Sequence, residues 1–186
     1  MPVKNIVDAS GVDMKKAVEH LQGQLSKVRT GRASASMLDN VKVEYYGAPT
    51  PLAQVGGIST PDARSIVIQP WDASTLNAIE KAILAANLGV TPQSDGVVIR
   101  ISVPPLTEER RKDIVKQCKK MAEDAKLVVR NIRRDANEEL KVAEKKEHYS
   151  EDDRKRGEEE IQKLTDRYVK DIDVVLGAKE KELLEE

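Results

Sequence analysis

Three stretches of this 186-residue sequence repeat apolar residues at alternating intervals of four and three, the spacing of one face of an α-helix. Such a face needs a partner, because an amphipathic helix is stable only when its apolar side is buried. The apolar positions of the first stretch are Val7, Gly11, Met14, Val18, Leu21, Leu25 and Val28. Those of the second are Ile114, Cys118, Met121, Ala125, Val128 and Ile132, continuing through Ala136 to Leu140 or Ala143. Those of the third are Ile161, Leu164, Tyr168, Ile172, Val175 and Leu183. Three such faces predict a three-helix bundle.

The second stretch predicts one long helix over residues 107–145. Thr107 precedes two glutamates, and Ser150 precedes three acidic residues at the start of the third stretch. Both patterns are typical of a helix N-terminus, where a side-chain oxygen satisfies free N–H groups and negative charge is favourable.

Between the first two helical stretches the pattern changes to that of short strands. Residues 41–45 alternate with a period of two, as in a half-buried strand, and residues 64–69 and 97–103 are β-branched runs between turn residues. Ser74 is a candidate cap for a short helix that ends near Gly89. These elements predict a small β/α/β module.

The order of these parts predicts an inserted domain. The first helix stands alone before the module and its partners follow it, so we expect an α+β fold with a bundle from residues 1–30 and 106–186 and an inserted domain from 31–105. The candidate hinge residues at the two connections are Thr30, Gly31, Arg32, Pro104 and Pro105. Glycine permits unusual φ angles and prolines stiffen the return path. A mobile module and a rigidly docked one both remain open.

Charge is divided unevenly among the helices, although the net charge is only −1. Residues 106–149 hold thirteen basic and ten acidic side chains, whereas residues 150–186 hold eight and thirteen. On a helical wheel, the basic residues of the long helix gather within about 60° of Arg130. This basic stripe consists of Lys112, Lys116, Lys119, Lys126, Arg130, Arg133, Arg134 and Lys141.

Two interpretations of the basic stripe are open. Its length of roughly 44 Å at 1.5 Å per residue suits a row of phosphates, and arginine is suited to bidentate phosphate contact. A solvated helix face with pairs such as Glu123 and Lys119 would have the same composition. Because only 3% of the residues are aromatic, a single-strand stacking platform is not favoured, and backbone recognition of folded RNA is the better nucleic-acid hypothesis.

Other functional classes find little support in the sequence. Cys118 lies in the apolar seam, His20 and His148 have no metal-ligand spacing, and Gly56–Gly57 lacks the Lys-Ser/Thr of a phosphate loop. We therefore predict no catalytic site, no metal and no cofactor. The N-terminus does not resemble a signal peptide, and no apolar run reaches the ~18 residues of a membrane span. These features, with a single cysteine, predict a cytoplasmic protein without a membrane partner.

Several longer motifs resemble those of the ribosome recycling factor family. They are residues 27–34 (KVRTGRAS), 43–47 (VEYYG), 104–112 (PPLTEERRK), 129–137 (VRNIRRDAN) and 150–153 (SEDD). The resemblance runs nearly end to end, with the motifs in the family's order. It implies an L-shaped monomer with a long three-helix bundle and a short β/α/β domain joined by a flexible hinge.

The resemblance also implies a function. Such a factor binds the ribosome after translation terminates and, with elongation factor G and GTP, splits it into subunits, so that messenger and deacylated transfer RNA are released. It is not itself an enzyme, because elongation factor G hydrolyses the GTP. An alternative hypothesis is a helical scaffold or chaperone-like protein, which would need its apolar seams exposed.

Carried over residue by residue, the family's contacts with 23S rRNA of the large subunit fall on a group of arginines. They are Arg29, Arg32, Arg110, Arg130 and Arg133. Arg134 and Asn137 belong to the same motif, and Lys126 is added from the basic stripe.

Overall fold

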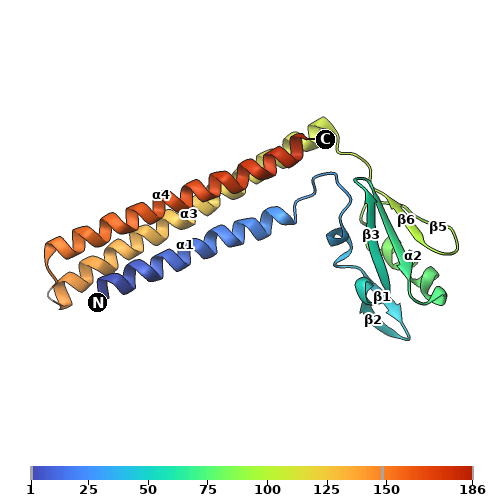
Figure 1. Ribbon diagram of the computed structural model, residues 1–186, viewed down its shortest axis with the longest axis horizontal. Helices are drawn as coiled ribbons and strands as arrows, with labels where there is room; N and C mark the ends of the chain where they lie inside the picture. The colour runs from blue at the N-terminus through green and yellow to red at the C-terminus, as the bar shows by residue number, and fades with distance from the viewer. Residues whose placement is uncertain (1, 148, 186) are drawn as a thin grey trace. The chain divides into compact units, whose positions relative to one another are not determined.

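The chain folds into two compact units in a computed structural model that describes residues 2–147 and 149–185. One unit contains Met1–Val28 and Glu108–Glu186, and the other is the continuous segment Arg29–Thr107. The first unit is helical and the second contains the strands (Figure 1), so the predicted α+β class is confirmed. None of the described helices is long and apolar enough to cross a membrane.

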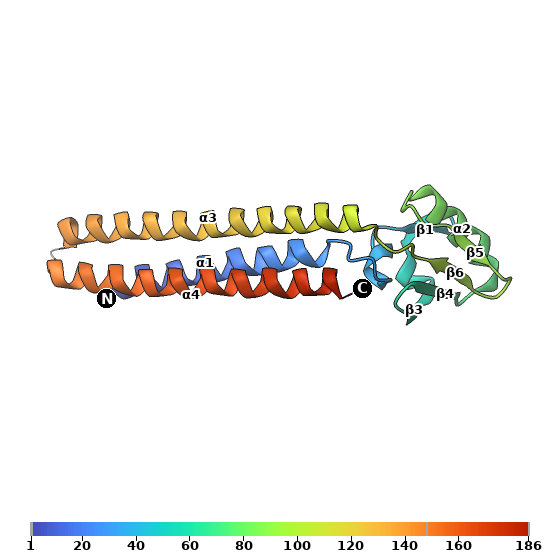
Figure 2. The ribbon, with the colours of Figure 1, turned by 90° about the horizontal axis from the view of Figure 1, so that it is seen from above.

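The helical unit is a bundle of α1 (Pro2–Ser26), α3 (Glu108–Glu147) and α4 (Glu151–Leu184), which lie side by side in Figures 1 and 2. The colours show that α1 and α4 run in the same direction and α3 runs against them. The fully or nearly fully buried side chains of its core include Met14, Leu21, Cys118, Ala122, Val129, Leu140, Ile161, Ile172 and Leu183. The three predicted amphipathic helices therefore do bury one another.

The buried face of α3 follows the predicted seam at Ile114, Cys118, Ala125, Ala136 and Leu140 but departs from it at Val128. Val128 is 47% exposed, whereas its neighbour Val129 is fully buried. The prediction that Val128 belongs to the seam is therefore wrong. Residues 127–129 are all apolar, so the local sequence leaves the choice among them to the packing of the neighbouring helices.

The start of α4 matches its predicted cap. The hydroxyl of Ser150 accepts a hydrogen bond from the backbone N–H of Asp153 at 3.1 Å and donates one to the Asp153 carboxylate at 2.8 Å. Acidic side chains fill the first turn of both α3 and α4, where they stabilise the helix dipole.

The second unit is built on antiparallel strands. A hairpin joins β1 (Lys42–Tyr45) to β2 (Ala48–Pro51) through Tyr46 and Gly47, both with positive φ angles. A separate sheet has the order β3-β4-β6-β5, with bounds Gly56–Asp62, Ser65–Pro70, Ile99–Ser102 and Pro92–Ser94 in that order. The predicted strands correspond to β1, β4 and β6, whereas β2, β3 and β5 were not predicted.

The helix α2 (Leu76–Ala85) supplies one side of this unit's core. Its buried Ile79 and Ile83 belong to one apolar cluster with alternate residues of β4 and β6, such as Ile66 and Ile99. The helix is preceded by a 3-10 turn over Ala73–Thr75, which is capped by the side chain of Asp72. Asp72 therefore caps this turn, and the prediction that Ser74 caps the helix is wrong, because the N-cap position of α2 is Thr75.

Candidate RNA-binding surface

The basic stripe lies on the solvent side of α3. Most of its members are exposed, namely Lys112, Lys116, Lys119, Arg130, Arg134 and Lys141. Lys126 and Arg133 are only partly exposed. The buried seam includes Ala122 and Val129, which lie closer to the stripe on the wheel than the predicted positions Met121 and Val128 do. Lys126 and Arg133 therefore fall on the border with α4.

Lys126 is held by carboxylates from two helices. Its ammonium lies 2.6 Å from Asp173 of α4 and 3.4 Å from Glu123 of its own helix, and its side chain is 15% exposed. The hydrogen bond to Asp173 is the main cause that raises the pKa of Lys126, with Glu123 adding to it. Two carboxylates more than balance one ammonium charge, so a phosphate contact by Lys126 requires it to give up one of them.

The arginines of the stripe are held differently. Arg133 donates from Nη1 to the amide oxygen of Gln162 on α4 at 3.1 Å, and Arg134 donates from Nη2 to the amide oxygen of Asn131 at 2.7 Å. These acceptors are neutral, so both guanidinium groups keep their full charge while their orientation is restricted.

Arg130 stands between these contacts on the same face. It is exposed and has no side-chain hydrogen bond or ion pair with any residue in 2–147 or 149–185. Its charge faces solvent without a protein partner in that part of the chain. Arg130, Arg133 and Arg134 together form the part of the stripe that is best suited to bind an anion.

The lysines toward the ends of α3 fit the solvated-face interpretation better. Lys112 pairs with Glu108 at 3.0 Å, and Lys141 pairs with Glu138 at 3.1 Å. Both are exposed pairs within one helix, and such pairs contribute little to stability. Glu123 pairs with Lys126 and not with the predicted Lys119.

The remaining candidates lie outside this central group. Arg110 is exposed in the first turn of α3, and Asn137 is half-buried one turn beyond the arginines. The amide oxygen of Asn137 is buried without a hydrogen-bond partner in the described part of the chain. Arg29 and Arg32, both exposed, belong to the second unit, where Arg29 donates to the carbonyl of Leu88 at 3.5 Å. The structure thus divides the predicted contacts between two units.

The two chain connections meet the second unit at one place. The N–H of Ala33 donates to the carbonyl of Ala63, and the N–H of Val103 donates to the carbonyl of Arg64, each at 2.7 Å. Both connections are thus tied to the turn between β3 and β4. Of the candidate hinge residues just outside these bonds, Gly31 is buried with a φ of 85°, Thr30 is half-buried, and Arg32, Pro104 and Pro105 are exposed.

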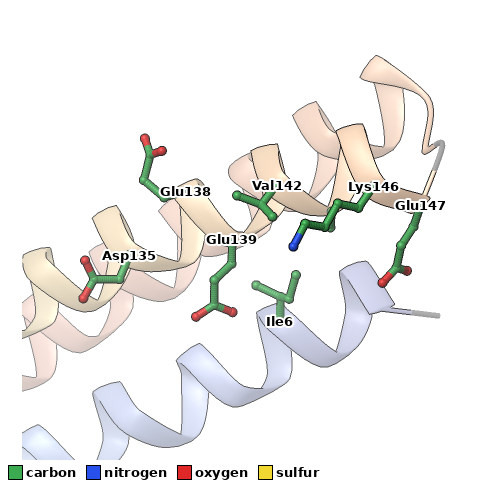
Figure 3. A pocket seen from close by; sticks show the side chains of 8 residues that line it. Ile6, Asp135, Glu138, Glu139, Val142, Lys146 and Glu147 are labelled. Carbon is green, nitrogen blue, oxygen red and sulfur yellow. The ribbon is translucent and has the colours of Figure 1, made fainter.

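A groove on another side of α3 is acidic. It has a volume of about 630 Å³ and lies between α1 and α3 (Figure 3). It is lined by Ile6, Asp135, Glu138, Glu139, Val142, Ala143, Lys146 and Glu147. Four carboxylates against one ammonium repel phosphate, so this side of the bundle is unsuited to RNA. The same helix therefore carries a basic face and an acidic one.

The described ranges lack a cluster of metal-binding side chains. No group of three or more His, Cys, Asp or Glu side chains there could hold a metal ion. Cys118 is fully buried, and this burial raises the pKa of its thiol. His148, which the sequence analysis considered, lies outside the described residues.

Sequence reasoning missed the residues that hold the cations, namely Asn131, Gln162 and Asp173. Asn131 lies three residues before Arg134, a spacing at which side chains on one helix meet, and this signal was available. Gln162 and Asp173 are on another helix, so their roles depend on how α4 is aligned with α3. No local pattern in the sequence specifies that alignment.

Comparison with known proteins gives one consistent family. Residues 21–184 match the family described as ribosome recycling factor. The chain is 52% identical over 185 residues to the ribosome-recycling factor of Nitratidesulfovibrio vulgaris, covering 100% of both chains. It is 55% identical over 172 residues to that of Oleidesulfovibrio alaskensis, covering 92% of this chain and 94% of the other.

Solved structures agree with these relatives. A solution structure of the ribosome recycling factor matches with a TM-score of 0.75 and 44% identity, covering 99% of this chain and 98% of the other. Models for the T. thermophilus ribosome recycling factor and the E. coli elongation factor G bound to the E. coli post-termination complex match with a TM-score of 0.62 and 44% identity, covering 99% of this chain and 100% of the other. This chain therefore belongs to the ribosome recycling factor family.

Proposed function

We propose that this protein recycles ribosomes after translation termination, by binding the post-termination ribosome and splitting it into subunits together with elongation factor G and GTP. Membership of the family over the full chain supports this function. A structural relative with 44% identity is described with elongation factor G on the post-termination complex. Messenger and deacylated transfer RNA are released by the splitting.

The proposed contact with 23S rRNA of the large subunit is made by phosphate-binding arginines. The observation that supports it best is the exposed group of Arg130, Arg133 and Arg134, whose charges are not neutralised by carboxylates in the described chain. Arg29, Arg32, Arg110 and Asn137 complete the proposed set. Lys126 joins it only by exchanging Asp173 or Glu123 for a phosphate.

Movement between the two units is the second part of the proposal. Gly31 adopts a φ of 85°, which glycine alone reaches without strain. Both connections are tied to the same turn of the second unit, at Ala63 and Arg64, so rotation about them moves that unit as one body. Elongation factor G would drive this motion with the energy of its own GTP hydrolysis. The factor itself then needs no catalytic site and acts as a monomer in the cytoplasm.

The scaffold hypothesis is less well supported. A scaffold that binds partner helices through its seams needs those seams accessible, yet the core residues of α1, α3 and α4 are buried against one another. In the described part of the bundle, large apolar side chains are exposed at a few positions spread over all three helices and not along one seam. They are Val12, Leu127, Val128, Val142, Val174 and Leu184.

The RNA contact is tested by the salt dependence of ribosome binding. Arg130→Ala and Arg133→Ala each remove one proposed phosphate contact, so each should weaken binding and lower the slope of log affinity against log salt by about one unit. Arg156→Ala is the matched control, because Arg156 is an exposed arginine of α4 outside the basic stripe. Equal slopes for all three variants and the parent protein would contradict the proposed contacts.

The splitting function is tested by light scattering of 70S ribosomes with elongation factor G and GTP. A disulfide between engineered cysteines, one in each unit, should leave binding intact and block the fall in scattering. Reduction of the same sample should restore splitting. Full activity of the oxidised, locked protein would show that movement between the units is not required.

A further inference from the structure

The contact between Arg133 and Gln162 joins the basic helix to the acidic one through a neutral group. Arg133 Nη1 donates to Gln162 Oε1 at 3.1 Å, across the border between α3 and α4. Arg133 is half-buried there, whereas Arg130 is exposed and has no such contact in the described chain. Arg133 is therefore the member of the central arginine group whose position depends on α4.

Gln162 is itself held in place. Its amide nitrogen donates to the Asp166 carboxylate at 2.9 Å, one turn further along α4. Because the amide group is planar, this bond fixes the direction of the oxygen on its other side, which is the atom that accepts from Arg133. Asp166 therefore takes part in the chain of contacts without being bonded to Arg133 in the described structure.

The same interface treats a second cation differently. About two turns away along α3, Lys126 meets the carboxylate of Asp173 at 2.6 Å. The acidic helix thus offers a charged acceptor to the lysine and an uncharged acceptor to the arginine. A carboxylate in place of Gln162 would pair with Arg133 and cancel its attraction for an anion.

We propose that Gln162 is a positioning residue for RNA binding, which orients the guanidinium of Arg133 while leaving its charge available to a ribosomal RNA phosphate. The inference rests on the proposed function, in which Arg133 makes the phosphate contact. A side chain held in its binding orientation loses less conformational freedom when RNA binds than a free one. On this view α4, an acidic helix, contributes to RNA affinity without touching RNA.

The test compares two substitutions that separate charge from orientation. Gln162→Glu keeps the shape but adds a carboxylate, so binding to 50S subunits should weaken roughly tenfold and the salt slope should fall by about one unit. Gln162→Met keeps the volume but removes the acceptor, so binding should weaken about two- to three-fold while the slope stays unchanged.

Gln117→Glu is the matched control. Gln117 is exposed on α3 and lies about 140° from Arg130 on the helical wheel, so the variant adds the same charge away from the basic stripe. It should bind with the affinity and slope of the parent protein. If Gln117→Glu lowers affinity and slope as much as Gln162→Glu does, the effect is one of net charge and the proposal is overturned.

Gln162→Glu in an Arg133→Ala background identifies the route of the effect. If Gln162 acts through Arg133, the second substitution should change neither the affinity nor the slope. A further loss of similar size in that background would overturn the positioning role. Thermal unfolding of each variant checks folding, because Gln162→Glu gains an ion pair with Arg133 but loses the hydrogen bond to Asp166 and brings two carboxylates together.

The two proposals fail in different ways. If Arg133→Ala alone leaves binding unchanged, the phosphate contact of Arg133 is wrong, and the role of Gln162 falls with it. If Arg133→Ala weakens binding while Gln162→Glu behaves as the parent protein, the contact stands and only the positioning role is overturned.

Discussion

The ammonium of Lys126 on α3 lies 2.6 Å from the carboxylate of Asp173 on α4. Glu123 approaches the same nitrogen to 3.4 Å, so one cation links two helices and two carboxylates. The contact lies along the basic stripe, where the sequence left open whether the cations bind phosphates or pair with carboxylates. It connects the stability of the bundle to the positive charge available on the basic stripe.

Replacing Asp173 with asparagine should destabilise the bundle modestly. Asp173 is 56% exposed, so we expect a loss of about 0.5–1 kcal/mol in the free energy of unfolding, measured with urea. Because the pKa of Lys126 is raised in the folded protein, this contribution is complete below the unfolded pKa of about 10.4 and is lost as the pH rises through the folded pKa. The difference in unfolding free energy between Asp173→Asn and the parent protein should be constant between pH 7 and 9 and shrink above pH 9. A difference that grows with rising pH would contradict the ion pair.

Glu159→Gln serves as the control, because Glu159 is an exposed carboxylate on the same helix, α4.

The same Asp173→Asn substitution should strengthen ribosome binding. It removes one of the two carboxylates that balance Lys126, so the basic stripe gains available positive charge. The slope of log affinity against log salt should become steeper, by up to about one unit. A flatter slope would show that Asp173 holds Lys126 in position for binding and does not compete with RNA.

Two adjacent glycines of β3 should respond differently to alanine. A Cβ atom on Gly56 would stand 2.8 Å from the backbone oxygen of Gln69, whereas one on Gly57 would meet nothing within 4 Å. Gly56→Ala must therefore push β3 away from β4, and should cost about 2 kcal/mol or more in the stability of the second unit. Gly57→Ala should cost less than about 1 kcal/mol. Equal melting temperatures for the two variants would contradict this packing.

The thiol of Cys118 should be unreactive in the folded protein. It is fully buried, and burial raises its pKa, so little thiolate is accessible to a reagent such as DTNB at pH 8. Labelling should appear only with denaturant. Cys118→Ser should destabilise the bundle by about 1–3 kcal/mol, because it places a hydroxyl in an apolar seam. Rapid labelling without denaturant would contradict the burial.

Alanine at two glycines of α4 should have opposite effects. At Gly157 a Cβ atom would stand 3.0 Å from both Leu140 Cδ1 and Val3 Cγ1, and Leu140 is almost fully buried. At Gly177 it would meet nothing within 4 Å. Gly177→Ala should stabilise the bundle by up to about 1 kcal/mol through helix propensity, while Gly157→Ala should lose that gain to crowding. Equal stabilisation of both variants would show that Leu140 and Val3 move aside freely.

The helices were predictable because their periodic patterns are long. Over the forty residues of α3, a wrong assignment at one position such as Val128 changes which residue is buried in that turn but not the existence of the helix. The strands that escaped prediction are short and carry turn residues, as in the two prolines of β2 and the paired glycines that open β3. They are strands because β2 pairs with β1 and β3 pairs with β4, and the composition of a single short segment does not indicate such pairing.

The candidate site was predictable in part for a similar reason. A helical wheel places Arg130, Arg133 and Lys126 on one face, because it depends only on positions within α3. It carries no information about α4, and therefore could not show that Arg133 meets an amide and Lys126 a carboxylate. The difference between these two cations follows from the alignment of two helices that are distant in sequence.

The parallel packing of α1 and α4 has a consequence for the order of folding during synthesis. Val3 and Gly157 meet in the bundle, although nearly the whole chain separates them. Helix α1 leaves the ribosome before α3 and α4, so its buried face, which includes Met14 and Leu21, is complete only when both later helices have been made. The continuous segment Arg29–Thr107 has no such delay and can fold first. During synthesis, the second unit of this protein can thus be folded while the helical bundle is still incomplete, until α4 has emerged from the ribosome.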